Sequence, residues 1–75
     1  MTPQDLAYEA MCKKIGYRPK FRSCLEHETA YAFRMGPSDI IFVMKDSGKA
    51  YWNYKMPVGT RPLDRGREIP LWDHL

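Results

Sequence analysis

The sequence predicts an α+β domain in which an N-terminal helix packs on an antiparallel sheet of three or four strands. Residues 3–15 carry helical periodicity between a start and a stop signal, whereas from Phe21 onward apolar residues recur at every second position. Further along, a turn sequence separates two apolar runs, as in a β-hairpin. We expect a single domain over residues 1–59 and a C-terminal tail, residues 60–75, that docks on the sheet or on a partner.

The helix is predicted from both of its ends. Thr2 is a preferred N-cap, Pro3 suits the first helical position, and Asp5 is placed to complete a capping box with Thr2. Gly16 is placed to end the helix, and Pro19 prevents its resumption. The apolar side chains share one broad arc of the helix: Leu6, Ala7, Tyr8, Ala10, Met11, Cys12 and Ile15.

Alternation predicts the next strand. Thr29, Tyr31, Phe33 and Met35 alternate with smaller or charged residues, and the turn-forming residues 36–39 follow. A helix over residues 26–34 remains an alternative, because the intervening alanines are poor strand formers.

The hairpin is predicted between residues 40–45 and 49–55, joined by Asp46, Ser47 and a left-handed Gly48. In this register Tyr51 pairs with Val43, and Trp52 pairs with Phe42 and fills the core. One face of the hairpin then carries Ile40, Phe42, Met44, Ala50, Trp52 and Tyr54, and the other face carries Ile41, Val43, Tyr51 and Asn53.

Both faces of this hairpin are apolar, and a single helix covers only one of them. Either the C-terminal tail folds back over the second face through residues 69–75, or a partner protein docks there, since exposed apolar patches mark interaction sites. The candidate protein-binding residues are therefore Ile41, Val43, Tyr51, Asn53 and Trp72.

A basic cluster occupies residues 13–22, which contain no acidic residue, although the whole chain has a net charge of only +3. Basic residues interleaved with aromatic ones are typical of surfaces that contact phosphates and stack bases. An acidic protein surface is the alternative partner, and a further interpretation is that the lysines complement the helix dipole. The candidate residues are Lys13, Lys14, Tyr17, Arg18, Lys20 and Arg22.

Several protein classes are not expected. The longest apolar run, residues 40–44, is far shorter than the roughly 20 residues that span a bilayer, and the opening MTPQDL lacks the features of a secretory signal. Two cysteines are too few for a disulfide-stapled scaffold, so a reducing cytoplasm is the expected compartment and no Cys12–Cys24 disulfide is expected. The positions of Cys12, Cys24, His27 and His74 match no zinc spacing, so no metal or cofactor is expected.

The densest titratable group is formed by Cys24, Glu26, His27 and Glu28. On a strand His27 points away from both glutamates, so we expect it at the surface and see no nucleophile–base pair. Because nucleotide-binding and hydrolase motifs are also missing from the sequence, neither catalytic residues nor enzymatic activity is expected.

Composition also suggests a domain of marginal stability. About a fifth of the residues are Leu, Ile, Val or Phe, which is low for a folded chain, although five Met, five Tyr and two Trp add apolar bulk. The first hypothesis is a small non-enzymatic interaction protein that binds and occludes a larger protein partner, in the manner of a phage-type inhibitor of nucleic-acid-handling machinery. The second is a module that binds DNA or RNA directly through the basic cluster.

Overall fold

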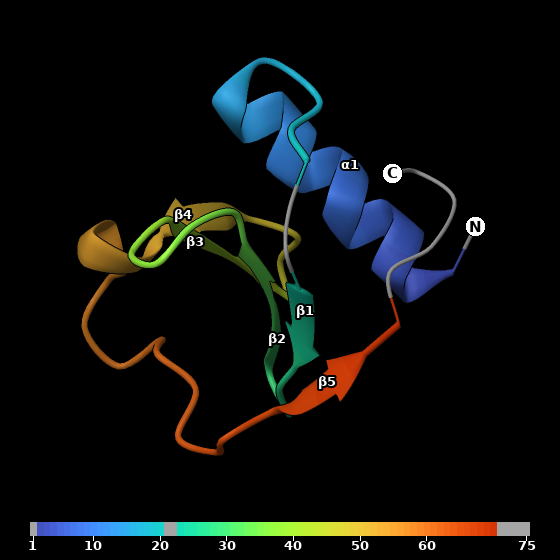
Figure 1. Cartoon of the computed structure of the whole chain (residues 1–75). Helices are drawn as coiled ribbons and strands as arrows, with labels where there is room; N and C mark the ends of the chain where they lie inside the picture. Colours follow the sequence, from blue (N-terminus) through green and yellow to red (C-terminus); the bar gives the residue numbers. More distant parts are fainter. Residues whose placement is uncertain (1, 21–22, 71–75) are drawn as a thin grey trace.

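The structure, a computed structural model, describes residues 2–20 and 23–70. One helix packs on one face of a five-stranded antiparallel sheet with the strand order β4-β3-β2-β1-β5 (Figure 1). The α+β prediction is confirmed, but the sheet has more strands than the three or four expected. The elements are α1 (Pro3–Ile15), β1 (Ser23–Glu26), β2 (Ala30–Arg34), β3 (Ile40–Met44), β4 (Ala50–Trp52), a 3-10 turn η1 (Asn53–Lys55) and β5 (Arg67–Ile69).

Helix α1 has the predicted bounds because both of its ends are satisfied locally. The Thr2 hydroxyl accepts a hydrogen bond from the Asp5 amide at 3.1 Å, and the Asp5 carboxylate accepts one from the Thr2 amide at 3.0 Å. At the other end Gly16 has φ = 87° and donates its amide to the Cys12 carbonyl at 2.8 Å. This left-handed cap satisfies a carbonyl that would otherwise lack a partner and turns the chain away from the helix axis.

The register of the β3–β4 hairpin differs from the predicted one. Ile41 pairs with Trp52 and Phe42 with Tyr51, and the Met44 amide donates to the Lys49 carbonyl at 2.9 Å. The loop therefore contains residues 45–48 and includes Lys45. A shift of one residue moves every side chain of a strand to the other face, so the predicted grouping of Ile41 and Val43 with Tyr51 is wrong.

The sheet buries side chains on both faces. On the face toward α1, helix residues pack against alternate strand residues, and the cluster includes Tyr8, Met11, Cys24, Phe33, Ile41 and Val43. On the opposite face a smaller cluster contains Ala30, Ala32, Phe42 and Met44, with Leu25, Ile40, Tyr51 and Met56 packed against it. Strand β2 is buried at four of its five positions, which explains the short alanines there, and the alternative helix over residues 26–34 is wrong.

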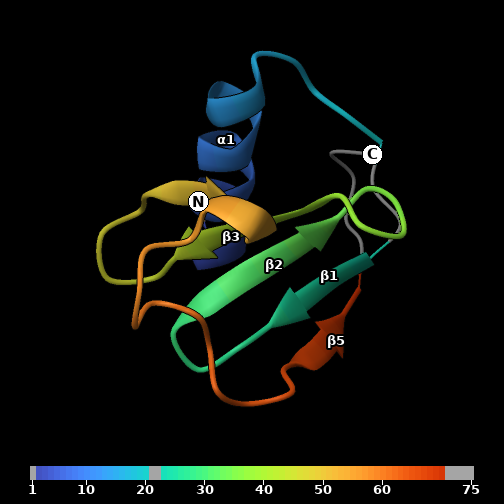
Figure 2. The same cartoon turned by 90° about the vertical axis from the view of Figure 1, so that its left-hand side faces the viewer.

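The second face is covered in part by the segment that joins η1 to β5, which runs along the side of the sheet opposite α1 (Figures 1 and 2). The Arg61 guanidinium lies 5.7 Å from the centre of the Phe42 ring and also donates to the Asn53 carbonyl. The segment ends at β5, which pairs with β1 through Cys24–Ile69 and Glu26–Arg67. Trp72 and the rest of residues 71–75 lie outside the described residues.

Candidate nucleic-acid interface

The end of α1 and the turn after it carry an exposed group of basic and aromatic side chains. We call this group the basic surface and define it as Lys13, Lys14, Tyr17, Arg18 and Lys20, all of which are exposed. Both views show this part of the chain at the top of the molecule, apart from the sheet (Figures 1 and 2). The predicted candidate Arg22 lies outside the described residues.

Local structure explains why these side chains gather. Lys13 and Lys14 lie in the last turn of α1, where positive charge complements the negative end of the helix dipole. Gly16 then reverses the chain, so that Tyr17 and Arg18 follow beside the helix end rather than continuing it. The buried Pro19 anchors this turn, and Lys20 beyond it is exposed again.

A broad, open hollow of about 880 Å³ lies within the basic surface and is lined by Lys13, Tyr17 and Arg18, with Glu9 on the same rim. Tyr17 is 62% exposed, so its ring is accessible to a ligand. An exposed ring between ammonium and guanidinium groups provides a stacking platform beside phosphate-binding charges.

Arg18 is held in place by two contacts. Its guanidinium lies 3.1 Å from a Glu9 carboxylate oxygen and 5.8 Å from the centre of the Tyr8 ring. The hydrogen bond to Glu9, together with contacts to Tyr8, raises the pKa of Arg18 above its ordinary value. Glu9 therefore offsets part of the Arg18 charge, whereas within the described part of the chain Lys13, Lys14 and Lys20 form no ion pair.

The predicted protein-binding face does not exist as one surface. Ile41 is fully buried and Val43 is 2% exposed, both beneath α1. Tyr51 lies half-buried on the other face of the sheet, and the half-buried Asn53 lies in η1. The hairpin register separates these residues, so Ile41 and Val43 present no surface to a partner.

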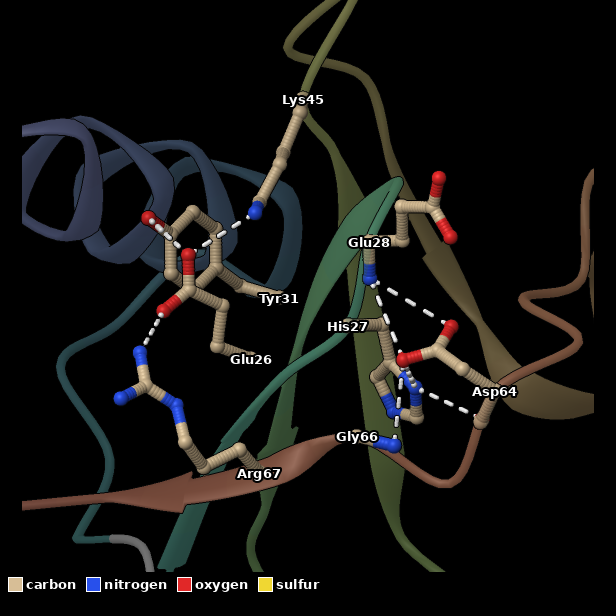
Figure 3. Close-up of polar contacts among 8 residues, drawn as sticks. All are labelled: Glu26, His27, Glu28, Tyr31, Lys45, Asp64, Gly66 and Arg67. Carbon is tan, nitrogen blue, oxygen red and sulfur yellow. Dashed lines mark hydrogen bonds and ion pairs between the residues drawn. The ribbon is translucent and has the colours of Figure 1, made fainter.

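Two polar clusters were not predicted (Figure 3). Glu26 lies between Lys45 and Arg67, with a carboxylate oxygen 2.9 Å from the terminal nitrogen of each. His27 is buried rather than exposed as predicted, and its Nδ1 lies 3.1 Å from the Asp64 carbonyl oxygen. No sequence signal could have revealed these contacts, because the partners come from distant parts of the chain. The pairing of β5 with β1 brings Arg67 to Glu26, and the pairing of β1, β2 and β3 brings Lys45 there.

Both cysteines lie within the described part of the chain. Burial raises the pKa of the Cys24 thiol to about 12, so at neutral pH it is a thiol rather than a nucleophilic thiolate. Cys12 and Cys24 are both free and buried. Within residues 2–20 and 23–70, no three His, Cys, Asp or Glu side chains lie where they could hold a metal ion.

The described residues also include no helix that is long and apolar enough to cross a membrane. Comparison with family models, with curated proteins and with solved structures finds no match for this chain, so the candidate function rests on its own residues.

Proposed function

We propose that this protein is a non-enzymatic module that binds single-stranded nucleic acid through the basic surface. The observation that carries the proposal is the exposure of Lys13, Lys14, Tyr17, Arg18 and Lys20 together at one end of the molecule, where Lys13, Tyr17 and Arg18 line an open hollow. The cytoplasm, where nucleic acid is abundant, is the compartment we propose for this activity.

The affinity would come mainly from the lysines. Each phosphate that a lysine neutralises releases condensed counterions, and this release drives binding at low salt. Lys13, Lys14 and Lys20 form no ion pair among the described residues, so phosphates could bind them without breaking one. Arg18 would contribute less, because Glu9 already occupies part of its guanidinium.

Tyr17 would supply the contact to bases. Its ring is exposed beside Lys13 and Arg18, and stacking on an aromatic ring requires a base that is not paired within a duplex. Lys13 and Lys14 lie in the last turn of α1 and Lys20 lies beyond its end, so the basic residues do not line one face along the helix. Binding of single strands with little sequence preference follows from this arrangement.

The test uses two variants with the same change of charge. The first replaces Lys13, Lys14 and Lys20 by Gln, and the matched control replaces the exposed Arg34, Lys55 and Arg65 by Gln. Binding to a labelled oligothymidine of about 16 nucleotides is followed by fluorescence anisotropy at low salt. We expect the first variant to lose at least about tenfold in affinity and the control to lose much less. Equal losses of affinity in the two variants would show that binding depends on overall charge rather than on the basic surface. If the unmodified chain did not bind the oligonucleotide, the proposal would be wrong.

Occlusion of a larger protein partner is the second candidate, and one observation favours it. In the segment after β4, Val58 and Leu63 are fully exposed and Tyr54 is 69% exposed. Large exposed apolar side chains in one segment are typical of a contact surface. The neighbouring Arg61 and Arg65 would direct this contact toward an acidic surface of the partner.

This second candidate is separated from the first by affinity capture after nuclease treatment. A partner retained by the unmodified chain should be lost from a variant with Val58→Glu and Leu63→Glu, since charge at these sites is incompatible with an apolar contact. A control with Ser38→Glu and Ser47→Glu adds the same charge in other exposed turns and should retain the partner. Loss of all captured material on nuclease treatment would leave nucleic acid as the only ligand.

A further inference from the structure

A cavity of about 490 Å³ lies between the first two turns of α1 and the sheet, and no residue of the basic surface lines it. Its volume falls in the range of small-molecule sites in proteins. Pro3, Leu6 and Ala7 line it from the helix, and Val43 lines it from β3. Leu6 is 57% exposed, which is explained by its position at the open side of this cavity.

The polar wall of the cavity is formed by Glu26, Tyr31 and Lys45. In Figure 3 the Glu26 carboxylate points toward both Lys45 and Arg67, with oxygen–nitrogen distances of 2.9 Å. The Lys45 ammonium also lies 5.0 Å from the centre of the Tyr31 ring. Two cations therefore surround one carboxylate, and the group of Glu26, Lys45 and Arg67 carries one net positive charge, with Arg67 lying outside the lining of the cavity.

We propose that this cavity binds a small amphipathic carboxylate, whose apolar body lies against Leu6, Ala7 and Val43 and whose carboxylate accepts a hydrogen bond from the Lys45 ammonium. This site is independent of the proposed nucleic-acid interface. The Lys45 ammonium has three N–H donors, and among the described residues it donates one hydrogen bond, to Glu26. The ligand carboxylate would take another.

The net charge of the group formed by Glu26, Lys45 and Arg67 favours an anion over a cation. Hydrogen bonds from Lys45, and to a smaller extent from Arg67, lower the pKa of Glu26. The Glu26 carboxylate is therefore charged at neutral pH, and these two cations already neutralise its charge. Burial raises the pKa of Tyr31, which keeps its phenol neutral. A cationic ligand would face the Lys45 ammonium, whereas a monocarboxylate would balance the remaining positive charge.

A matched set of three probes tests the preference. Phenylpropionate, phenylpropionamide and phenylpropylamine share one apolar body and differ in the charge of the head group. Each is titrated into the isotope-labelled full chain while the backbone amide signals are followed by NMR. We expect saturable shifts at Leu6, Ala7 and Lys45, with the carboxylate binding more tightly than the amide and the amine binding most weakly. No saturable shift at these residues, or an amine that binds as tightly as the carboxylate, would overturn the proposal.

Two variants test the position of the site. Lys45→Gln should lower the affinity for phenylpropionate by about tenfold and leave the affinity for phenylpropionamide nearly unchanged. Lys49→Gln, in the same hairpin, should change neither affinity. Leu6→Trp should fill the cavity and abolish binding, and its exposed position makes the substitution compatible with the fold. Unchanged affinity in both Lys45→Gln and Leu6→Trp would contradict the assignment.

Discussion

Gly66 lies directly against the imidazole of His27, and a Cβ built on Gly66 would come within 2.7 Å of His27 Cε1. The ring is held from other sides as well, because it packs 5.8 Å from the Phe42 ring and its Nδ1 lies 3.1 Å from the Asp64 carbonyl oxygen. The Asp64 carboxylate in turn accepts the amides of Glu28 and Gly66, each at 3.2 Å. These contacts fasten the end of the segment 56–66 to the sheet beside β5 (Figure 3).

Gly66→Ala should therefore destabilise the fold strongly. The new methyl group would meet a buried ring, and the backbone at φ = 78° is already unfavourable for alanine. We expect a loss of about 2 to 4 kcal/mol in the free energy of unfolding, measured by chemical denaturation. Gly59→Ala is the control, since Gly59 has φ = 83° but no atom within 4 Å of its added Cβ, and should cost only about 1 kcal/mol. Equal losses in the two variants would show that His27 does not confine Gly66.

The stability that Glu26 provides should depend on pH. Hydrogen bonds from Lys45 and Arg67 lower the pKa of Glu26 in the folded state. Its contribution is therefore complete above the ordinary pKa of a glutamate and is lost as the pH falls through the lower, folded-state pKa. The chain should be more stable than its Glu26→Gln variant at pH 7, and this difference should shrink in acid. A difference that stayed constant from neutral pH into strong acid would contradict this ion pair, and the exposed Glu68→Gln is the control.

Cys24 should resist alkylation in the folded protein. Burial raises the pKa of its thiol to about 12 and also blocks access to the reagent. Iodoacetamide at mildly alkaline pH should modify Cys24 only after denaturant is added, and mass spectrometry of the peptides would report this. Rapid modification of Cys24 under native conditions would show that the sheet and α1 do not enclose it as described.

Tyr17→Ala should weaken binding to single strands without affecting the fold. Its exposed ring is the stacking platform of the basic surface, and loss of one stacked base costs about 1 to 3 kcal/mol. Tyr54→Ala is the matched control, because Tyr54 is 69% exposed in η1 rather than in the basic surface. Oligothymidine affinity measured by anisotropy should fall only in the first variant. A similar fall in both would mean that Tyr17 has no specific role.

The sequence was most informative where the determinants are local. Thr2, Asp5 and Gly16 fix the bounds of α1 through contacts within a few residues, and these bounds are as predicted. The same holds for the exposure of the described basic residues, which follows from their place at a helix end. Local signals of this kind need no knowledge of the rest of the fold.

The hairpin register could not be read from the sequence. Gly48 is left-handed, with φ = 71°, and a left-handed glycine suits both the predicted loop and the observed loop of residues 45–48. Alternation did not decide between them either, because both faces of β3 are apolar. In the observed register Ala50 and Trp52 pack with Ile41 and Val43 on the face toward α1, and that packing depends on the assembled sheet.

Strand β5 and the burial of His27 could not be predicted from the sequence for a different reason. Arg67 lies far from Glu26 along the chain, and Gly66 and Asp64 are equally distant from His27, so no local pattern records their contacts. His27 between two glutamates resembles a solvated residue. His27 is covered by residues 64–66, which reach it because β5 pairs with β1.

The most direct test of the central proposal is the salt dependence of binding to single-stranded DNA. If the basic surface contacts phosphates through Lys13, Lys14 and Lys20, the logarithm of the affinity should fall linearly with the logarithm of the salt concentration, with a slope of about −2. The variant in which these three lysines are Gln should lose most of this slope, and the Arg34, Lys55 and Arg65 control should retain it. A slope near zero for the unmodified chain, or one that survives in the lysine variant, would contradict the proposal.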